Sequence, residues 1–122
     1  MQTFYGHNNA VNSVAFNPKG DAIASTDSDG IVKVWDVRMV KEMSEFDCGM
    51  ASANCASFDA SGEMLVIGSE DGSIKLQNIT SGEREGELKG HEDSVNFVIV
   101  DSSKEGSMVI SASSDCTFRI WQ

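Results

Sequence analysis

Short apolar runs alternate with polar turns along the whole chain, and one type of run has a two-residue period. In the stretch Asp29–Arg38, DGIVKVWDVR, Val32 and Val34 share one side of the chain and a lysine stands between them. A period of two is typical of a half-buried β-strand, whereas a helix repeats its apolar positions every three or four residues. The pattern returns in DGSIKLQNIT from Asp71 and in DCTFRIWQ from Asp115. The chain is therefore predicted to be all-β.

Two further strand-like runs precede each alternating run. The first runs end at polar turns that contain glycine, as hairpins do; they are VNSVAF from Val11, ANCASF from Ala53 and VNFVIV from Val95. The second runs are AIAST from Ala22, MLVIGS from Met64 and MVISA from Met108. More polar stretches around MSEF and EGELK predict a fourth, outer strand in the first two units.

This strand pattern repeats after about 42 residues. Phe16 and Phe58 lie 42 positions apart, and Gly6-His7 returns as Gly90-His91 after two such periods. The third unit is longer because its first turn is expanded to DSSKEG, Asp101–Gly106. A repeat of this length is typical of one four-stranded propeller blade. We expect three repeats, at about residues 6–47, 48–89 and 90–122, in one partial, open β-propeller spanning residues 1–122.

A Gly-His pair in a loop, followed by a strand that ends on Trp-Asp, resembles the signature of the WD-repeat β-propeller family. The resemblance covers essentially the whole chain and is strongest in GHNNAVNSVAFNPKGDAIASTDSDGIVKVWD. It implies three four-stranded blades and a protein–protein interaction scaffold. It also implies a structural hydrogen-bonded tetrad of loop His, second-strand Ser, turn Asp and third-strand Trp. The corresponding residues are His7, Ser25, Asp29 and Trp35 in the first repeat, and His91, Ser111, Asp115 and Trp121 in the third.

The middle repeat departs from this pattern. Gly49, Ile67 and Gln77 stand at the His, Ser and Trp positions, and only Asp71 is retained. No tetrad can form there, so we expect packing and turn chemistry to hold this blade. The other two repeats contain the residue types of a hydrolase triad. Because the set occurs once in each of two repeats, an architectural role explains it better than catalysis, and we predict no enzyme activity.

Composition narrows the classes of partner. The chain has 9 Lys and Arg against 19 Asp and Glu, a formal net charge of −10. This balance argues against nucleic acid, whose binding requires clustered cations. The opening MQTFYGHNN lacks the basic and apolar regions of a secretory leader, and no apolar run approaches 18 residues, so we expect a soluble chain that is not secreted. Three cysteines without CxxC spacing, Cys48, Cys55 and Cys116, are expected to be buried thiols in a reducing compartment.

Metal binding has one candidate stretch. Asp27, Asp29 and Gly30 have spacings that resemble half of an EF-hand loop. The loop would have to begin at Ser25 and end at Asp36, and both flanks are predicted strands, so a plain hairpin turn fits better. We predict no metal, no cofactor and no catalytic residues.

Three blades cannot complete a ring, which takes 4–8 blades. QTFY, Gln2–Tyr5, resembles the outer strand of a preceding blade, and the last repeat ends on its third strand. The chain would then be part of a larger propeller or a short product of the same locus. Alone, we expect it to self-associate through its open edges. Two chains would supply six blades, with Gln2–Tyr5 of one beside Thr117–Trp121 of the other.

Partner contacts are expected in the loops on one face of the blades. The exposed candidates are Asn8, Asn9, Glu70, Glu92 and Asp93. Within the WD-repeat family, ASTDSDG and VWDVRMV are most similar to the C-terminal repeats of the sperm-associated antigens of the axonemal central apparatus. That resemblance implies a structural role in cilia and flagella, central-apparatus protein partners, and a cytoplasmic, cytoskeletal location in the axoneme. The alternative is a general WD-repeat adaptor of a ubiquitin-ligase or signalling complex.

Overall fold

The described part of the chain consists of β-strands joined by turns and loops. The structure, a computed structural model, describes the backbone of residues 1–103 and 106–122. Side chains are described for all residues except 102–107. The first sheet contains β1 (Val11–Phe16), β2 (Ala22–Asp27), β3 (Ile31–Asp36) and β4 (Lys41–Asp47). The second contains β5 (Ala53–Phe58), β6 (Met64–Ser69), β7 (Ile74–Asn78) and β8 (Arg84–Leu88). The third contains β9 (Val95–Ser103), β10 (Gly106–Ser113) and β11 (Phe118–Trp121). The all-β prediction is confirmed.

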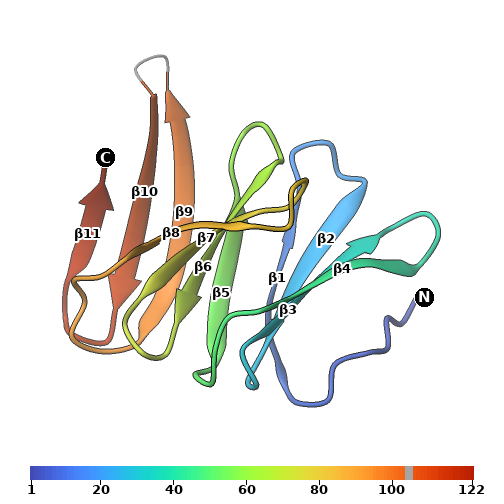
Figure 1. Cartoon of the computed structure of the whole chain (residues 1–122), viewed down its shortest axis with the longest axis horizontal. Helices are drawn as coiled ribbons and strands as arrows, with labels where there is room; N and C mark the ends of the chain where they lie inside the picture. The colour runs from blue at the N-terminus through green and yellow to red at the C-terminus, as the bar shows by residue number, and fades with distance from the viewer. Residues whose placement is uncertain (104–105) are drawn as a thin grey trace.

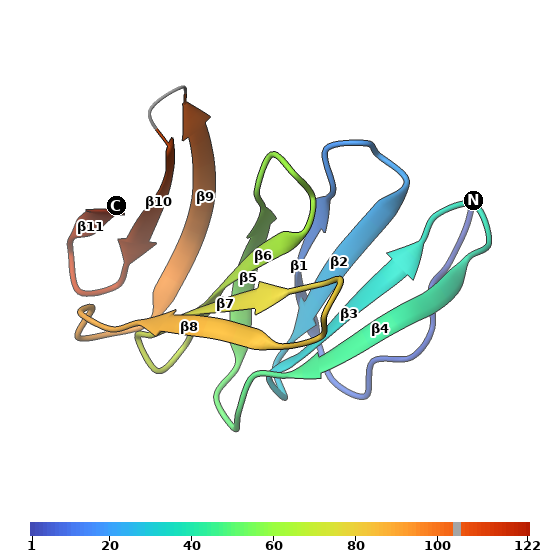
Figure 2. The same ribbon diagram turned by 45° about the horizontal axis from the view of Figure 1, so that its top comes forward.

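Each sheet is a meander of antiparallel strands in chain order, which we call blades 1, 2 and 3. The blades stand side by side like an open fan, with β5 between β1 and β9 (Figure 1). A turned view shows the outer strands β4 and β8 along one side and the two chain ends at opposite ends of the fan (Figure 2). The fan is an unclosed arc of propeller blades, as predicted. Blade 3 has three strands in the described residues, and β11 forms its outer edge.

The expanded turn predicted in the third repeat lies partly outside the described residues, at positions 104–105. Its flanks are strands, since β9 continues to Ser103 and β10 begins at Gly106. No helix in the described part of the chain is long and apolar enough to cross a membrane.

Blade 1 packs on blade 2 through small and branched apolar side chains. Ala24, Val32 and Val34 of blade 1 and Leu65 and Ile67 of blade 2 are all at most 1% exposed. Successive residues of a strand point to opposite faces of the sheet. Val66, between Leu65 and Ile67, accordingly faces blade 3. Blade 2 is therefore covered on both faces, which explains the nearly continuous apolar run MLVIG in β6.

Blade 2 packs on blade 3 through a second apolar cluster. Its buried members are Cys55, Val66, Ile74, Val95 and Val98, and Leu88 and Trp121 pack against them. Burial raises the pKa of the Cys55 thiol to about 11, so this thiol behaves as a small apolar group. Cys48 is likewise buried, but the expectation of three buried thiols is wrong for Cys116, which is exposed in the β10–β11 turn.

The tight turns between second and third strands need a left-handed residue. Gly30 and Gly72 supply it with φ of +82° and +87°, while blade 3 has Cys116 with φ of +72° at this position. Gly30 also lies against the following chain segment. A Cβ atom there would stand 2.3 Å from the carbonyl oxygen of Gly49 and 2.7 Å from that of Ala51. Position 30 in the β2–β3 turn therefore favours glycine for two reasons, the positive φ angle and the close carbonyl oxygens of Gly49 and Ala51.

Gly30→Ala is expected to destabilise the chain more than Gly20→Ala. Both glycines have positive φ, which costs an alanine about 1 kcal/mol, but a Cβ at Gly20 meets nothing within 4 Å. The clash at Gly30 should add about 1–3 kcal/mol. Urea unfolding followed by circular dichroism measures both variants against the parent chain. Equal losses in the two variants would show that the close carbonyl contacts do not matter.

Candidate functional site: the polar networks and the loop edge

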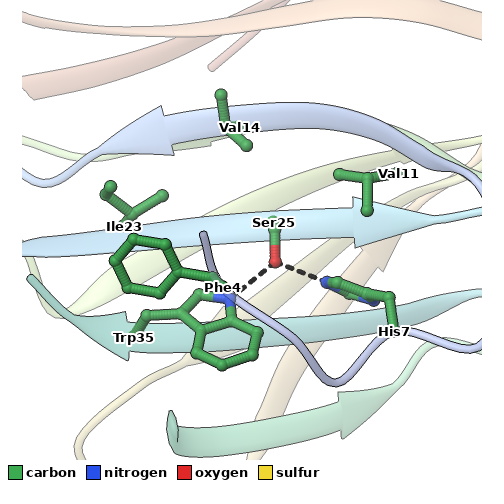
Figure 3. A pocket seen from close by; sticks show the side chains of 7 residues that line it. All are labelled: Phe4, His7, Val11, Val14, Ile23, Ser25 and Trp35. Atoms are coloured by element: carbon green, nitrogen blue, oxygen red, sulfur yellow. Dashed lines mark hydrogen bonds between the residues drawn. The ribbon is translucent and has the colours of Figure 1, made fainter. Parts of the chain in front are cut away.

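A chain of four buried side chains links the loop before β1 to β2 and β3. Trp35 Nε1 lies 2.8 Å from Ser25 Oγ, and His7 Nε2 lies 2.5 Å from the same oxygen. His7 Nδ1 lies 2.7 Å from Asp27 Oδ2. An indole only donates and a carboxylate only accepts, so the protons run from Trp35 to Ser25 to His7 to Asp27. Figure 3 shows the Ser25 hydroxyl between the indole ring of Trp35 and the imidazole ring of His7.

The carboxylate in this network differs from the predicted one. The resemblance to the family signature predicted Asp29 there, but the structure places Asp27 against His7. Asp29 is exposed and accepts a hydrogen bond from Asn9 Nδ2 at 2.9 Å. The physical reason is the second oxygen of Asp27. It accepts the backbone N–H groups of Asp29 and Ile31, both at 2.9 Å, so one carboxylate closes the turn and binds the histidine.

The pKa of Asp27 is lowered. Burial by itself raises it, but this effect is outweighed by the hydrogen bond from His7 and by those from the backbone of Ile31 and Asp29. The network therefore holds a charged carboxylate at the base of the β2–β3 turn.

Blade 3 assembles the residues named for it. His91 Nδ1 lies 2.9 Å from Asp115 Oδ2, His91 Nε2 lies 2.7 Å from Ser111 Oγ, and Trp121 Nε1 lies 2.9 Å from the same hydroxyl. Asp115 also accepts the hydroxyl and the N–H of Thr117. The Thr117 hydroxyl, followed by His91, holds the pKa of Asp115 well below its usual range. Blade 1 has Ile31 where blade 3 has Thr117, so Asp29 lacks the side-chain partner that fixes Asp115.

Blade 2 has a different network in the same region. Lys75, only 3% exposed, donates to Ser73 Oγ at 2.6 Å and to Asp71 Oδ2 at 3.2 Å. Ser73 in turn donates to Asp71 Oδ1 at 2.5 Å. Desolvation raises the pKa of Asp71, but the bonds from Ser73 and Lys75 prevail and lower it. The equivalent lysine of blade 1, Lys33, pairs instead with Glu42 and Glu45 of β4.

A set of asparagines that the sequence analysis did not single out connects the blades. Asn12 Nδ2 of blade 1 donates to Ala53 O of blade 2 at 3.0 Å. One repeat later, Asn54 Nδ2 of blade 2 donates to Val95 O of blade 3 at 3.1 Å. Both asparagines sit at a register shift between the first and second strands of their blades. Asn96 is the third member of this series. An asparagine is the second residue in each of the runs VNSVAF, ANCASF and VNFVIV, and this repetition is the sequence signal that could have identified the set.

The chemistry of these networks is structural. Ser25 is 5% exposed, its oxygen accepts the Trp35 N–H and its own proton is directed to His7, so the hydroxyl is a buried link between β3 and the loop before β1. Asp27 and Asp29, the acidic residues of the calcium alternative, are used by His7 and Asn9. Among the described residues, no group of three or more His, Cys, Asp or Glu side chains could hold a metal ion.

The five expected contact residues lie on one edge of the fan. Asn8 and Asn9 precede β1, Glu70 lies in the β6–β7 turn, and Glu92 and Asp93 precede β9; all five are exposed. The loops are tied together there. Asn9 reaches the β2–β3 turn, Ser94 Oγ donates to Glu70 O at 3.2 Å, and the N–H of Glu92 donates to Asp115. We call this surface the loop edge.

Ser25→Ala is expected to lower the free energy of unfolding by about 2–3 kcal/mol, because it leaves the Trp35 N–H and a His7 nitrogen without a partner. Ser44→Ala, half-buried in β4 outside the network, serves as the matched control and should stay within about 0.5 kcal/mol. Denaturant unfolding decides the outcome. A Ser25→Ala variant as stable as the control would mean that the hydrogen-bond chain does not stabilise blade 1.

Asp27→Asn is expected to remove the contribution of Asp27 to the pH dependence of stability, and Asp29→Asn, which leaves Asp27 in place, is the matched control. A lowered folded-state pKa contributes stability that is present above the unfolded value of about 4 and is lost as pH falls through the folded value. The parent chain and Asp29→Asn should therefore lose this contribution below about pH 4. Asp27→Asn should lack it at every pH. Urea unfolding at several pH values measures the slopes, and a parent-like profile for Asp27→Asn would refute the assignment.

Known proteins share both the repeat and the fold. The family "WD domain, G-beta repeat" matches residues 1–36, 43–78 and 82–122. The chain is 35% identical over 111 residues to guanine nucleotide-binding protein subunit beta-5b of Danio rerio, covering 89% of the chain and 28% of that protein. It is 32% identical over 113 residues to guanine nucleotide-binding protein subunit beta-2 of Caenorhabditis elegans, covering 91% and 30%. The chain thus spans less than a third of these relatives.

The fold is matched by a crystal structure of RRP9 WD40 repeats with a TM-score of 0.91 at 18% identity. This match covers 98% of the chain and 37% of the matched protein, and at that identity it speaks for the fold alone. WD40 repeat proteins serve as scaffolds for protein interactions. The repeat matches, the three blades and the polar networks lead to one conclusion: the chain belongs to the WD40 repeat family.

Proposed function

We propose that this chain is a protein-binding scaffold that uses the loop edge to bind a basic segment of its partner. The observation that carries the proposal is the gathering of exposed carboxylates there, from Glu70, Glu92 and Asp93. The loops are tied to one another by hydrogen bonds, from the N–H of Glu92 to Asp115 and from Ser94 Oγ to the carbonyl oxygen of Glu70, so a partner meets a surface whose loops are already held together. A rigid acidic surface favours basic partners and repels acidic ones.

We further propose that the partner belongs to the central apparatus of the ciliary and flagellar axoneme. This finer assignment is supported by the similarity of ASTDSDG and VWDVRMV to the repeats of the sperm-associated antigens. The first stretch covers the end of β2 and the β2–β3 turn, and the second covers the end of β3 and the β3–β4 turn. The location would then be the cytoskeleton of motile cilia. An acidic chain would meet a protein of the apparatus in preference to the acidic surface of tubulin.

The second candidate function is that of an adaptor in a signalling complex. It is favoured by the similarity to two relatives that are subunits of guanine nucleotide-binding proteins. Such an adaptor would bind its partner through the same loop edge. The complex that it serves could equally be a ubiquitin ligase. The two candidates differ in where the chain resides and in what it captures.

The test is expression of the tagged chain in ciliated cells, with a charge-reversed variant beside it. Glu70→Lys, Glu92→Lys and Asp93→Lys together should abolish axonemal staining and partner capture, while the parent chain stains the central pair. Glu63→Lys, exposed in the β5–β6 turn at the opposite edge, is the matched control and should behave as the parent. Retained capture by the triple variant would refute the loop edge. A signalling or ubiquitin-ligase complex in place of axonemal proteins would refute the axonemal assignment.

A further inference from the structure

We propose that a groove between blades 1 and 2 binds an extended, basic peptide segment of a partner protein, with the side-chain amide of Gln77 bonded to the backbone of that segment. The groove lies beside the outer strands β4 and β8 and uses none of the carboxylates of the loop edge. The inference therefore goes beyond the function proposed above and can fail independently of it. It rests on an unpaired, nearly buried amide, on the shape of the groove and on its charge.

Gln77 of β7 stands where the other two blades have a tryptophan. The equivalent residues are Trp35 and Trp121, whose indole N–H groups each donate to a serine hydroxyl. In blade 2 the serine position is occupied by Ile67, which offers no acceptor. Gln77 is only 4% exposed, yet its side-chain amide makes no hydrogen bond within the part of the chain that the structure describes. Blade 2 thus holds a polar group at this position without the partner that the other blades provide.

The amide of Gln77 is accessible from one direction. Burial of an amide without a hydrogen-bond partner is costly. Among the described residues, the fully enclosed side-chain atom without a partner is Thr26 Oγ1 and not an atom of Gln77. The amide therefore opens onto the groove that Gln77 lines. Its carbonyl oxygen and its NH2 group match the N–H and the C=O of a peptide backbone.

The groove has the size of a ligand site. Its volume is about 450 Å³, within the range of about 300–1,000 Å³ that is typical of such sites. Both blades line it, with Glu45, Phe46 and Asp47 of β4 on one side and Gln77, Gly82 and Arg84 on the other. The strands β4 and β8 run along the same side of the fan (Figure 2), so the groove opens at its outer strands.

One wall of the groove is an edge strand. β4 is the last strand of its sheet, so the backbone groups of its outer edge are open for pairing. Arg84 Nη2 already donates to one of them, the backbone oxygen of Asp47, at 3.2 Å. Sheet edges bind extended peptides by main-chain hydrogen bonds. A segment that lies along β4 would bring its own backbone to the amide of Gln77.

The surroundings of the groove carry more negative than positive charge. Four exposed carboxylates belong to its lining residues or to their neighbours in the chain, namely Glu45, Asp47, Glu83 and Glu85. Two cations offset them in part, because Arg84 lines the groove and Lys33 pairs with Glu45. The remaining negative charge favours a segment with Lys or Arg side chains over an acidic segment.

Phe46 supplies an aromatic surface in the groove. Its side chain is half-buried and packs against the apolar cluster between blades 1 and 2, so its position is fixed. The methylene stem or the charged end of a Lys or Arg side chain can lie against such a ring. The groove therefore offers a group for each part of a basic residue: an amide for its backbone, a ring for its stem and carboxylates for its charge.

The first experiment follows the amide of Gln77 by nitrogen–proton correlation NMR. Side-chain NH2 groups give their own signals, and Gln77→Met identifies the signal of Gln77 by its loss. Titration with the peptide acetyl-Ser-Arg-Ser-Arg-Ser-amide should shift this signal together with the backbone signals of residues 45–47 and 82–84. The analogue with Glu in place of Arg should shift none of them. An unchanged Gln77 signal at millimolar Arg peptide overturns the proposal.

A loop-edge variant keeps this proposal separate from the function proposed above. The chain with Glu70→Lys, Glu92→Lys and Asp93→Lys should show the same shift of the Gln77 signal as the parent chain. Loss of the shift in this variant would place the Arg peptide on the loop edge and would refute the groove.

The second experiment separates the amide from the charge by comparing peptide affinities. Gln77→Met keeps a similar shape without the amide and should bind the Arg peptide about fivefold to tenfold more weakly. Arg84→Gln removes a like charge and should bind it about twofold more tightly. Glu63→Gln, exposed in the β5–β6 turn, is the control and should match the parent. Weaker binding by Arg84→Gln would indicate an acidic ligand and refute the basic segment.

The stability of Gln77→Met distinguishes a binding role of the amide from a structural one. The variant removes an unpaired polar group from a nearly buried position, so it should unfold at a urea concentration no lower than that of the parent. A clear loss of stability would assign the amide to the fold and would contradict the proposal, as would parent-like affinity for the Arg peptide.

Discussion

The burial of apolar side chains between neighbouring sheets is the interaction on which this structure depends. A single four-stranded sheet of some 40 residues cannot enclose a core of its own. Leu65 and Ile67 on one face of β6, and Val66 on the other, show how blade 2 solves the problem by being covered on both sides. The two buried apolar clusters accordingly lie on the two faces of blade 2, which links blade 1 to blade 3.

The polar networks are a consequence of that packing. The side chains of Ser25 and Ser111 lie on the face that turns toward a preceding blade, where an isolated hydroxyl would be costly. Linking indole, hydroxyl, imidazole and carboxylate in one direction satisfies every member and ties a loop to two strands. Blade 2 replaces the hydroxyl position with Ile67, which needs no partner, and moves its polar contacts to Lys75 and the turn. Two chemically different solutions therefore support the same backbone.

Much of this architecture could be predicted from the sequence. Alternating runs and glycine turns define strands by local rules, and β1, β5 and β6 begin and end where the runs VNSVAF, ANCASF and MLVIGS do. The choice between Asp27 and Asp29 could not be made in this way. Asp29 follows Ser25 by four residues, as Asp115 follows Ser111, so the repeat spacing favoured Asp29. The backbone N–H groups that Asp27 accepts, which the sequence does not reveal, place Asp27 on the histidine instead.

The contacts between blades also could not be predicted from the sequence. A strand pattern indicates which residues are buried, but it does not show that Asn12 bonds to an oxygen 41 residues away. The exposed Cys116 is a second example. It occupies a turn position that glycine fills in the other two blades, and their pattern does not indicate whether a side chain there is buried or exposed. Local rules thus predicted the sheets, while the connections between sheets required the three-dimensional structure.

The bonds from Asn12 to Ala53 and from Asn54 to Val95 are one contact displaced by a single blade. Neighbouring units are consequently interchangeable at their junctions. Excising residues 48–89 would bring Asn12 opposite Val95, with a donor and an acceptor still matched, and duplicating that stretch would lengthen the arc by one sheet. A gene built from such units could therefore gain or lose one with the donor and the acceptor of this contact still matched at the new junction.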